Sequence, residues 1–154
     1  MSMITEQVQT ALTIRAMRKD DAEAVAQLTA QLGYERSPGE IGDWIARLAQ
    51  REDQQAAFVA CLGEEVVGWI EISIERRLQS PEFGLIGGLV VSQGHRSGGI
   101  GRRLCERAEA WSREHGLTRL RVTSRSTRAD AHRFYLRDGY EVMKTSMVFE
   151  KKLP

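Results

Sequence analysis

Cysteine and proline are scarce in this chain of 154 residues, which contains two cysteines and three prolines. Cys61 and Cys105 do not have the spacing of metal ligands or of a redox pair, and each lies in an apolar periodic segment. We therefore interpret both as buried thiols of a cytoplasmic protein. No apolar run approaches the ~20 residues that span a membrane. The composition argues against a disulfide-stapled scaffold, a disordered chain and a membrane-spanning protein.

An excess of charge of one sign is also lacking, because the formal net charge is +1. The basic residues are not interleaved with aromatic residues, so we expect neither nucleic acid nor a membrane as a partner. The two halves differ, however: residues 1–77 have a net charge of −5 and residues 78–154 one of +6. This division suits a protein that holds an anionic cofactor with its second half and a cationic partner with its first. An uneven surface without function would look the same.

The organisation of the chain follows from its apolar periodicity. Residues 1–11 lack the pattern of a signal peptide and are expected to form a flexible tail, and residues 12–154 have the length of one domain. Alternation predicts strands at 12–17, 56–62, 65–75, 84–91, 117–124 and 145–153, with a further strand at 140–144 as an option. Helical spacing predicts helices at 20–32, after Ser37, from about 100 to 115, and at 129–139. Ser37 and Glu40 have the spacing of a capping box, with Pro38 at the first helical position.

Six of the 14 glycines lie in residues 87–104, between an apolar strand and a basic helix. A strand that leads through a glycine-rich loop into a helix places unpaired backbone N–H groups and the positive helix end at one point, which suits phosphate. The loop lacks the G-K-[ST] of a Walker site and a G-x-G-x-x-G followed by an acidic residue. A pyrophosphate held without a metal ion is the remaining interpretation. The adjacent Gly87 and Gly88 predict either a bulge in the strand or a close approach of another group to its backbone.

The sequence resembles the GNAT acetyltransferases. Their acyl-CoA loop, [QR]-x-x-G-x-[GA], matches Arg96 to Gly101, and their aromatic–tyrosine helix matches "DAHRFYLRDGY" at residues 130–140. That helix is especially similar to the aminoalkylphosphonate N-acetyltransferase branch. The resemblance implies one α/β domain, with a mixed, mostly antiparallel sheet of six to seven strands, splayed between the fourth and fifth strands and flanked by four helices.

The same resemblance implies acetyl-CoA as co-substrate, no metal, and a set of cofactor-binding residues. The pantetheine arm would pair with the fourth strand, the pyrophosphate would bind the loop, and Arg128 would reach a CoA phosphate. The implied residues are Leu89, Val90, Val91, Arg96, Ser97, Gly98, Gly99, Ile100, Gly101, Arg102, Arg128 and Tyr135. A homodimer is implied by analogy, through the last strands.

Transfer of an acetyl group to an amine needs a base, support for the developing oxyanion and a proton for the leaving thiolate. By resemblance Tyr135 donates that proton, since an ordinary tyrosine hydroxyl (pKa ~10) stays protonated when a thiol (pKa ~8.5) begins to ionise. The Val91 N–H would polarise the carbonyl. Many relatives carry a glutamate on the fourth strand, which is absent here, so Glu71 and Glu75 on the neighbouring strand are the candidate bases. His95 is an alternative base, and His132 is interpreted as structural.

The acceptor is expected to be an amine of a small molecule or peptide, bound by the first two helices and the later strand loops. Glu35, Glu40 and Asp43 make the first helical region acidic, which favours a cationic amine such as a polyamine, an aminoglycoside or a protein amine. The sequence therefore predicts a cytoplasmic N-acetyltransferase that transfers the acetyl group directly. Two alternatives remain open: a non-catalytic acyl-CoA-binding regulatory module, and a nucleotide-phosphate enzyme that uses the same loop.

Overall fold

The computed structural model describes residues 11–96 and 98–154, which form two compact units, one up to residue 122 and the other from residue 123. Apart from Ala11, the expected tail lies outside the described residues, and so does Ser97. The first unit contains all the strands of the sheet, and each unit is described by itself below.

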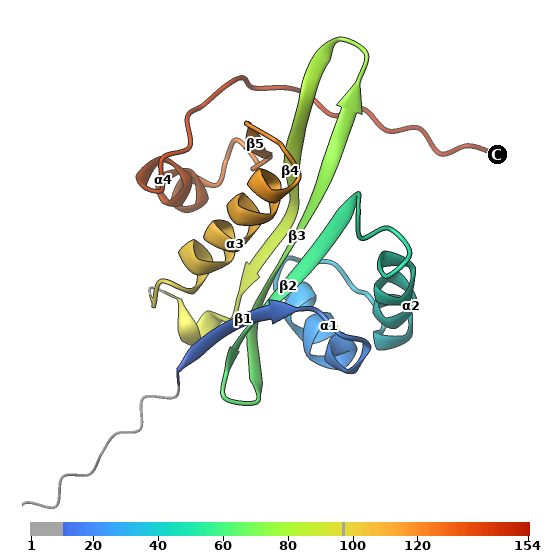
Figure 1. Cartoon of the computed structure of the whole chain (residues 1–154), viewed down its shortest axis with the longest axis vertical. Coiled ribbons are helices and arrows are strands. Elements are labelled where there is room, and N and C mark those ends of the chain that lie inside the picture. Colours follow the sequence, from blue (N-terminus) through green and yellow to red (C-terminus); the bar gives the residue numbers. More distant parts are fainter. Residues whose placement is uncertain (1–10, 97) are drawn as a thin grey trace, which may run out of the picture. The chain divides into compact units, whose positions relative to one another are not determined.

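The first unit is built on a five-stranded sheet in the order β1-β2-β3-β4-β5 (Figure 1). Strands β1 to β4 pair with one another in antiparallel fashion, and only β4 and β5 pair in parallel. The mixed, mostly antiparallel sheet is therefore confirmed, with five strands instead of six or seven. The strands are β1 (Leu12–Ala16), β2 (Gln55–Leu62), β3 (Glu65–Arg77), β4 (Ser80–Val91) and β5 (Leu120–Val122).

The predicted splay between β4 and β5 is also confirmed. β5 pairs only with Gly84–Ile86, so the following five residues of β4, 87–91, have no strand partner on that side among the described residues. On the other side, the pairing of β4 with β3 shifts by one residue between Glu71 and Ile72, which pair with Gly88 and Ile86. Gly87 is the extra residue, so the predicted glycine bulge exists.

The helices of the first unit cover both faces of the sheet (Figure 1). α2 (Pro38–Leu48) begins with the predicted capping box, in which Ser37 Oγ accepts from the Glu40 N–H at 3.1 Å. α1 (Ala22–Ala30) is shorter than the predicted 20–32, because residues 19–21 form a 3₁₀ turn in which Asp21 accepts from the Arg18 N–H at 2.7 Å. α3 (Ile100–Glu114) lies on the opposite face and ends before Gly116, whose φ of 76° favours glycine.

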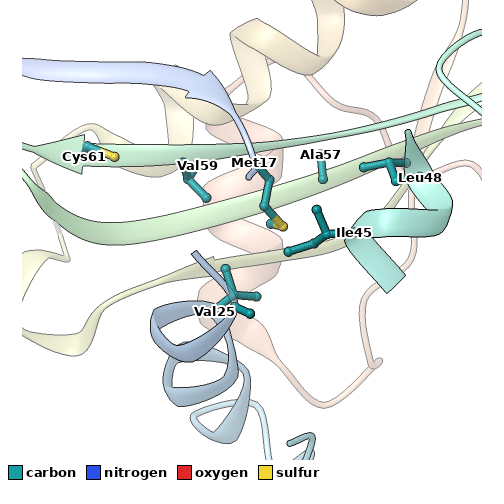
Figure 2. Packing of buried hydrophobic residues seen from close by; sticks show 8 residues of the cluster. Met17, Val25, Ile45, Leu48, Ala57, Val59 and Cys61 are labelled. Carbon is teal, nitrogen blue, oxygen red and sulfur yellow. The ribbon is translucent and has the colours of Figure 1, made fainter. Parts of the chain in front are cut away.

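The core beneath α1 and α2 is a cluster of buried side chains from both helices and from β2 (Figure 2). The side chains of Met17, Val25 and Ile45 point toward one another and share the cluster with Ala57 and Val59 of β2. Trp44 and Trp69 are partly buried and pack against this cluster. The alternation of β2 and β3 puts Trp69 and Glu71 on this face, since they pair with Val59 and Ala57.

The second unit holds α4 (Ala129–Arg137), close to the predicted helix and followed by Gly139 at φ 92°. The predicted strand at 145–153 and the optional one at 140–144 were wrong, because residues 140–154 form no secondary structure. An alternating pattern predicts a strand only where another strand supplies its hydrogen bonds. The segment's large apolar side chains are all exposed: Val142, Met143, Met147, Val148, Phe149 and Leu153.

Candidate active site

The glycine-rich loop joins β4 to α3, as the sequence predicts. A single 3₁₀ turn (Gln93–His95) follows β4, and Gly99 then forms the N-cap of α3 with φ 77° and ψ 8°. This left-handed conformation strains residues other than glycine. No described side chain caps the helix, so the first N–H groups of α3, at Ile100 and the residues after it, remain available to an anion.

The described glycines of the loop are not crowded by neighbouring atoms. A Cβ built on Gly94 or Gly99 meets no described atom within 4 Å, and one built on Gly98 meets only the His95 carbonyl oxygen at 3.5 Å. The glycines therefore face open space and do not serve internal packing. Arg96 is exposed beside them, and Arg102 lies in the first turn of α3, where its Nε is 3.3 Å from Glu106. The loop thus combines oriented N–H groups with positive charge.

The open edge of β4 leads directly into this loop. Residues 87–91 pair with no strand on the β5 side among the described residues. The Ser92 N–H donates to the Val67 carbonyl at 2.8 Å, which fixes the strand end on β3. Leu89, Val90 and Val91 therefore present one main-chain edge that can pair with an extended amide chain. The Val90 side chain itself is buried and anchors the strand.

The Glu71 carboxyl lies over the bulge. A Cβ on Gly87 would collide with Oε1 of Glu71 and would lie 3.0 Å from its Cδ, so only glycine leaves room for the carboxyl there. Glu71 has no hydrogen-bond or ion-pair partner among the described residues, and burial raises the pKa of its carboxyl. An unpaired, desolvated carboxylate beside an open strand edge is suited to accept a proton.

The other candidate bases differ from Glu71. Glu75 accepts from Ser73 Oγ at 3.3 Å and lies 3.9 Å from Arg77, so its carboxylate already has partners. His95 is half-buried in the loop, and its Nδ1 has no hydrogen-bond partner in the described part of the chain. All three residues are half-buried, and Glu71 differs in that its carboxyl lies over the bulge and has no partner among the described residues.

The second unit, taken by itself, contains the tyrosine helix. Tyr135 on α4 makes edge-to-face contacts with Phe134 and Tyr140, at centroid distances of 5.2 and 5.7 Å. Arg128 precedes the helix and is exposed, and the His132 ring contacts the Arg125 carbonyl at 2.8 Å. That contact ties His132 to its own loop, in keeping with a structural role.

Two features of the site were not anticipated from the sequence. The glycine pair was expected to release strand hydrogen bonds, but each glycine also makes room for a side chain of β3, Gly87 for Glu71 and Gly88 for Trp69. The sequence signal for this was the presence of two small residues in β4 opposite bulky residues of β3, which indicates that the small residues leave space for the bulky ones. Glu40, expected in an acidic acceptor region, caps α2 and lies 3.6 Å from Arg36, so a structural role accounts for it.

In residues 11–96 and 98–154, no group of three or more His, Cys, Asp or Glu side chains is arranged to hold a metal ion. The same residues contain no helix with the length and apolarity needed to cross a membrane.

Comparison with known proteins gives consistent relatives. The chain is 28% identical over 151 residues to an aminoglycoside N(6')-acetyltransferase type 1 of Stenotrophomonas maltophilia, covering 95% of this chain and 97% of that one. It is 38% identical over 78 residues to an aminoalkylphosphonate N-acetyltransferase of Salmonella typhimurium, about half of each chain (50% and 51%). Its fold matches AAC(6')-Iy bound to a CoA-based bisubstrate analogue, with a TM-score of 0.81, 18% identity, and 93% and 99% of the two chains covered.

The family itself is decided by a sequence model that spans most of the chain. The model described as "Acetyltransferase (GNAT) family" matches residues 16–140, which include the β4 bulge, the glycine loop and the tyrosine helix. The chain therefore belongs to the acetyltransferase (GNAT) family and is an acetyl-CoA-dependent N-acetyltransferase.

Proposed function

We propose that this N-acetyltransferase acts in the cytoplasm on a cationic primary amine, with Glu71 as general base and Tyr135 as general acid. The observation that carries the proposal is the Glu71 carboxyl, which is half-buried over Gly87, next to the open edge of β4, and has no partner among the described residues. Cys61 and Cys105 are buried thiols that are not joined in a disulfide, which is in keeping with a reducing compartment.

The proposed chemistry assigns one proton to each residue. Glu71 takes a proton from the acceptor ammonium through a water molecule, and the neutral nitrogen attacks the thioester carbonyl carbon. The Val91 N–H donates to the carbonyl oxygen as negative charge develops there. The carbon–sulfur bond then breaks, and the Tyr135 hydroxyl gives its proton to the departing thiolate. The attacking nitrogen loses its second proton as the amide forms, and that proton restores the Tyr135 hydroxyl through solvent. Glu75 is not needed in this scheme.

The residues proposed to hold the co-substrate divide by chemistry. The main chain of Leu89, Val90 and Val91 pairs with the pantetheine amides. The N–H groups and side chains from Arg96 to Arg102, with Ser97 among them, hold the pyrophosphate, and Arg128 reaches a further phosphate. The open space at Gly94 and Gly99 supports this assignment.

Two observations support a cationic acceptor. Residues 1–77 have a net charge of −5, and the unpaired Glu71 carboxylate faces the α1–α2 side of the sheet. A relative that aligns over nearly its whole length is named as an aminoglycoside acetyltransferase. An aminoglycoside or another polyamine is therefore the acceptor class we propose.

The test is release of free thiol from acetyl-CoA across a panel of amines. The panel contains aminoglycosides, polyamines, aminoalkylphosphonates, amino acids and peptides. Turnover with an aminoglycoside or polyamine, at a kcat/KM at least about tenfold above the other classes, is the expected result. Preference for aminoalkylphosphonates would contradict the cationic class. CoA binding without turnover of any amine would favour a non-catalytic acyl-CoA-binding module.

We also propose that the protein is a homodimer, with residues 140–154 at the interface. This segment exposes six large apolar side chains, more than a monomer of this size usually leaves uncovered in one stretch. The double variant Val148→Asp, Phe149→Asp should convert a dimer to a monomer in sedimentation velocity experiments. Leu78→Asp, which changes an equally exposed apolar residue between β3 and β4, should leave the dimer intact. A wild-type chain that sediments as a monomer would refute the proposal.

A further inference from the structure

Gly88 lies directly beneath the indole ring of Trp69. A Cβ on Gly88 would lie 2.6 Å from Cη2 and 2.8 Å from Cζ3 of Trp69, distances that no side chain tolerates. The six-membered ring of the indole therefore rests on the backbone of β4. The Glu71 carboxyl fills the space at Gly87 in the same way. The backbone of these two consecutive glycines therefore forms one floor beneath two side chains of β3.

The register places Trp69 next to Glu71. Glu71 pairs with Gly88, and Trp69 pairs with Val90, so the indole extends over the residue opposite Glu71. Residues two apart on one strand face lie about 7 Å apart, within reach of an aromatic side chain. The ring thus fills the space beside the Glu71 side chain, on the face of the sheet that α1 and α2 cover.

Trp69 is also held from its other side. It packs against the core cluster that includes Val25 of α1 and Ile45 of α2. The ring is therefore fixed between the helix pair and the floor of β4, and its position does not depend on Glu71. A glutamate without such a neighbour has several rotamers open to it, most of which take the carboxyl away from Gly87.

We propose that Trp69 is a positioning residue, whose indole ring holds the Glu71 carboxyl over the β4 bulge in the orientation that removes the acceptor proton. The proposal rests on the proposed role of Glu71 as base. Trp69 itself transfers no proton and acts only by limiting where the carboxylate can lie. Misplacement of a reacting group by about 1 Å can cost about 10²-fold in rate, so the effect belongs to kcat.

A double-mutant cycle tests this role. Trp69→Ala should lower kcat about 10- to 100-fold and leave the KM for acetyl-CoA within about twofold, whereas Trp69→Phe, which keeps a ring, should retain most of kcat. In the Glu71→Gln background, Trp69→Ala should have almost no further effect. Gly88→Ala keeps the indole but displaces it, and should reproduce the loss of kcat if Trp69→Ala does not fold.

The control is Met17→Ala, which removes a large side chain from the same core cluster (Figure 2). It should lower the melting temperature and leave kcat unchanged. Equal losses from Trp69→Ala in the wild-type and Glu71→Gln backgrounds would overturn the positioning role, and so would an unchanged kcat in Trp69→Ala. Full activity of Glu71→Gln alone would instead refute the proposed base.

Discussion

Glu71→Gln is expected to lower kcat by about 100-fold or more and, at the same time, to raise the melting temperature. Removal of a general base costs about 10²–10⁴-fold in rate. The amide is isosteric with the carboxyl, so it fits over Gly87, and it is neutral, so its burial is less unfavourable than that of an unpaired carboxylate. Steady-state thiol release and calorimetry on the same preparation measure both effects.

The gain in stability has a defined pH dependence. Burial raises the pKa of the Glu71 carboxyl above its ordinary 4.5, so the folded chain binds this proton more tightly than the unfolded chain. The contribution of Glu71 is therefore most favourable below pH 4.5 and is lost as the pH rises through the raised pKa. The difference in melting temperature between Glu71→Gln and the wild type should grow over that range. Glu75→Gln, whose carboxylate has partners, should lose less activity; a larger loss there would transfer the base role to Glu75.

Tyr135→Phe is expected to lower kcat at least about tenfold with little change in the KM for either substrate. The phenyl ring keeps the edge-to-face contacts with Phe134 and Tyr140, and the hydroxyl proposed to protonate the thiolate is lost. Acceptor assays with acetyl-CoA, combined with a melting curve, separate this loss from unfolding. Tyr140→Phe removes a hydroxyl from the neighbouring ring and should retain kcat. If both variants lose activity equally, Tyr135 is not the specific proton donor.

The architecture was readable from the sequence wherever local pattern and packing agree. The capping box at Ser37 and Glu40, the stop at Gly116 and the glycine loop before α3 are local signals, and the structure contains each of them. Strands β1 to β4 followed from alternating or continuously apolar runs, and the two-residue connection at Gly63 and Glu64 predicted the β2–β3 hairpin. Such features depend on a few neighbouring residues and need no knowledge of distant contacts.

Other features depend on partners that the sequence pattern does not identify. Alternation from residue 145 predicted a strand, but a strand requires a neighbour with free hydrogen-bonding groups, and none pairs with this segment in the described residues. The two candidate bases, Glu71 and Glu75, look equivalent in the sequence because they share a face of β3. Only the burial of Glu71 and the pairing of Glu75 with Ser73 and Arg77 distinguish them.

The single extra residue in β4 reverses the face rule along that strand. Before it, even-numbered positions such as Gly84 and Ile86 face α3; after it, odd-numbered positions such as Leu89 and Val91 do, as their β3 partners Ile70 and Gly68 indicate. Gly87 therefore acts as a one-residue insertion that shifts the side-chain alternation of the rest of β4. Deletion of Gly87 would exchange the faces on which the following residues of β4 lie. It would also displace both the backbone beneath Glu71 and the strand edge that leads to the glycine loop. Insertions and deletions in this strand should be far less tolerated than substitutions, and related chains should keep its length even where they change its residues.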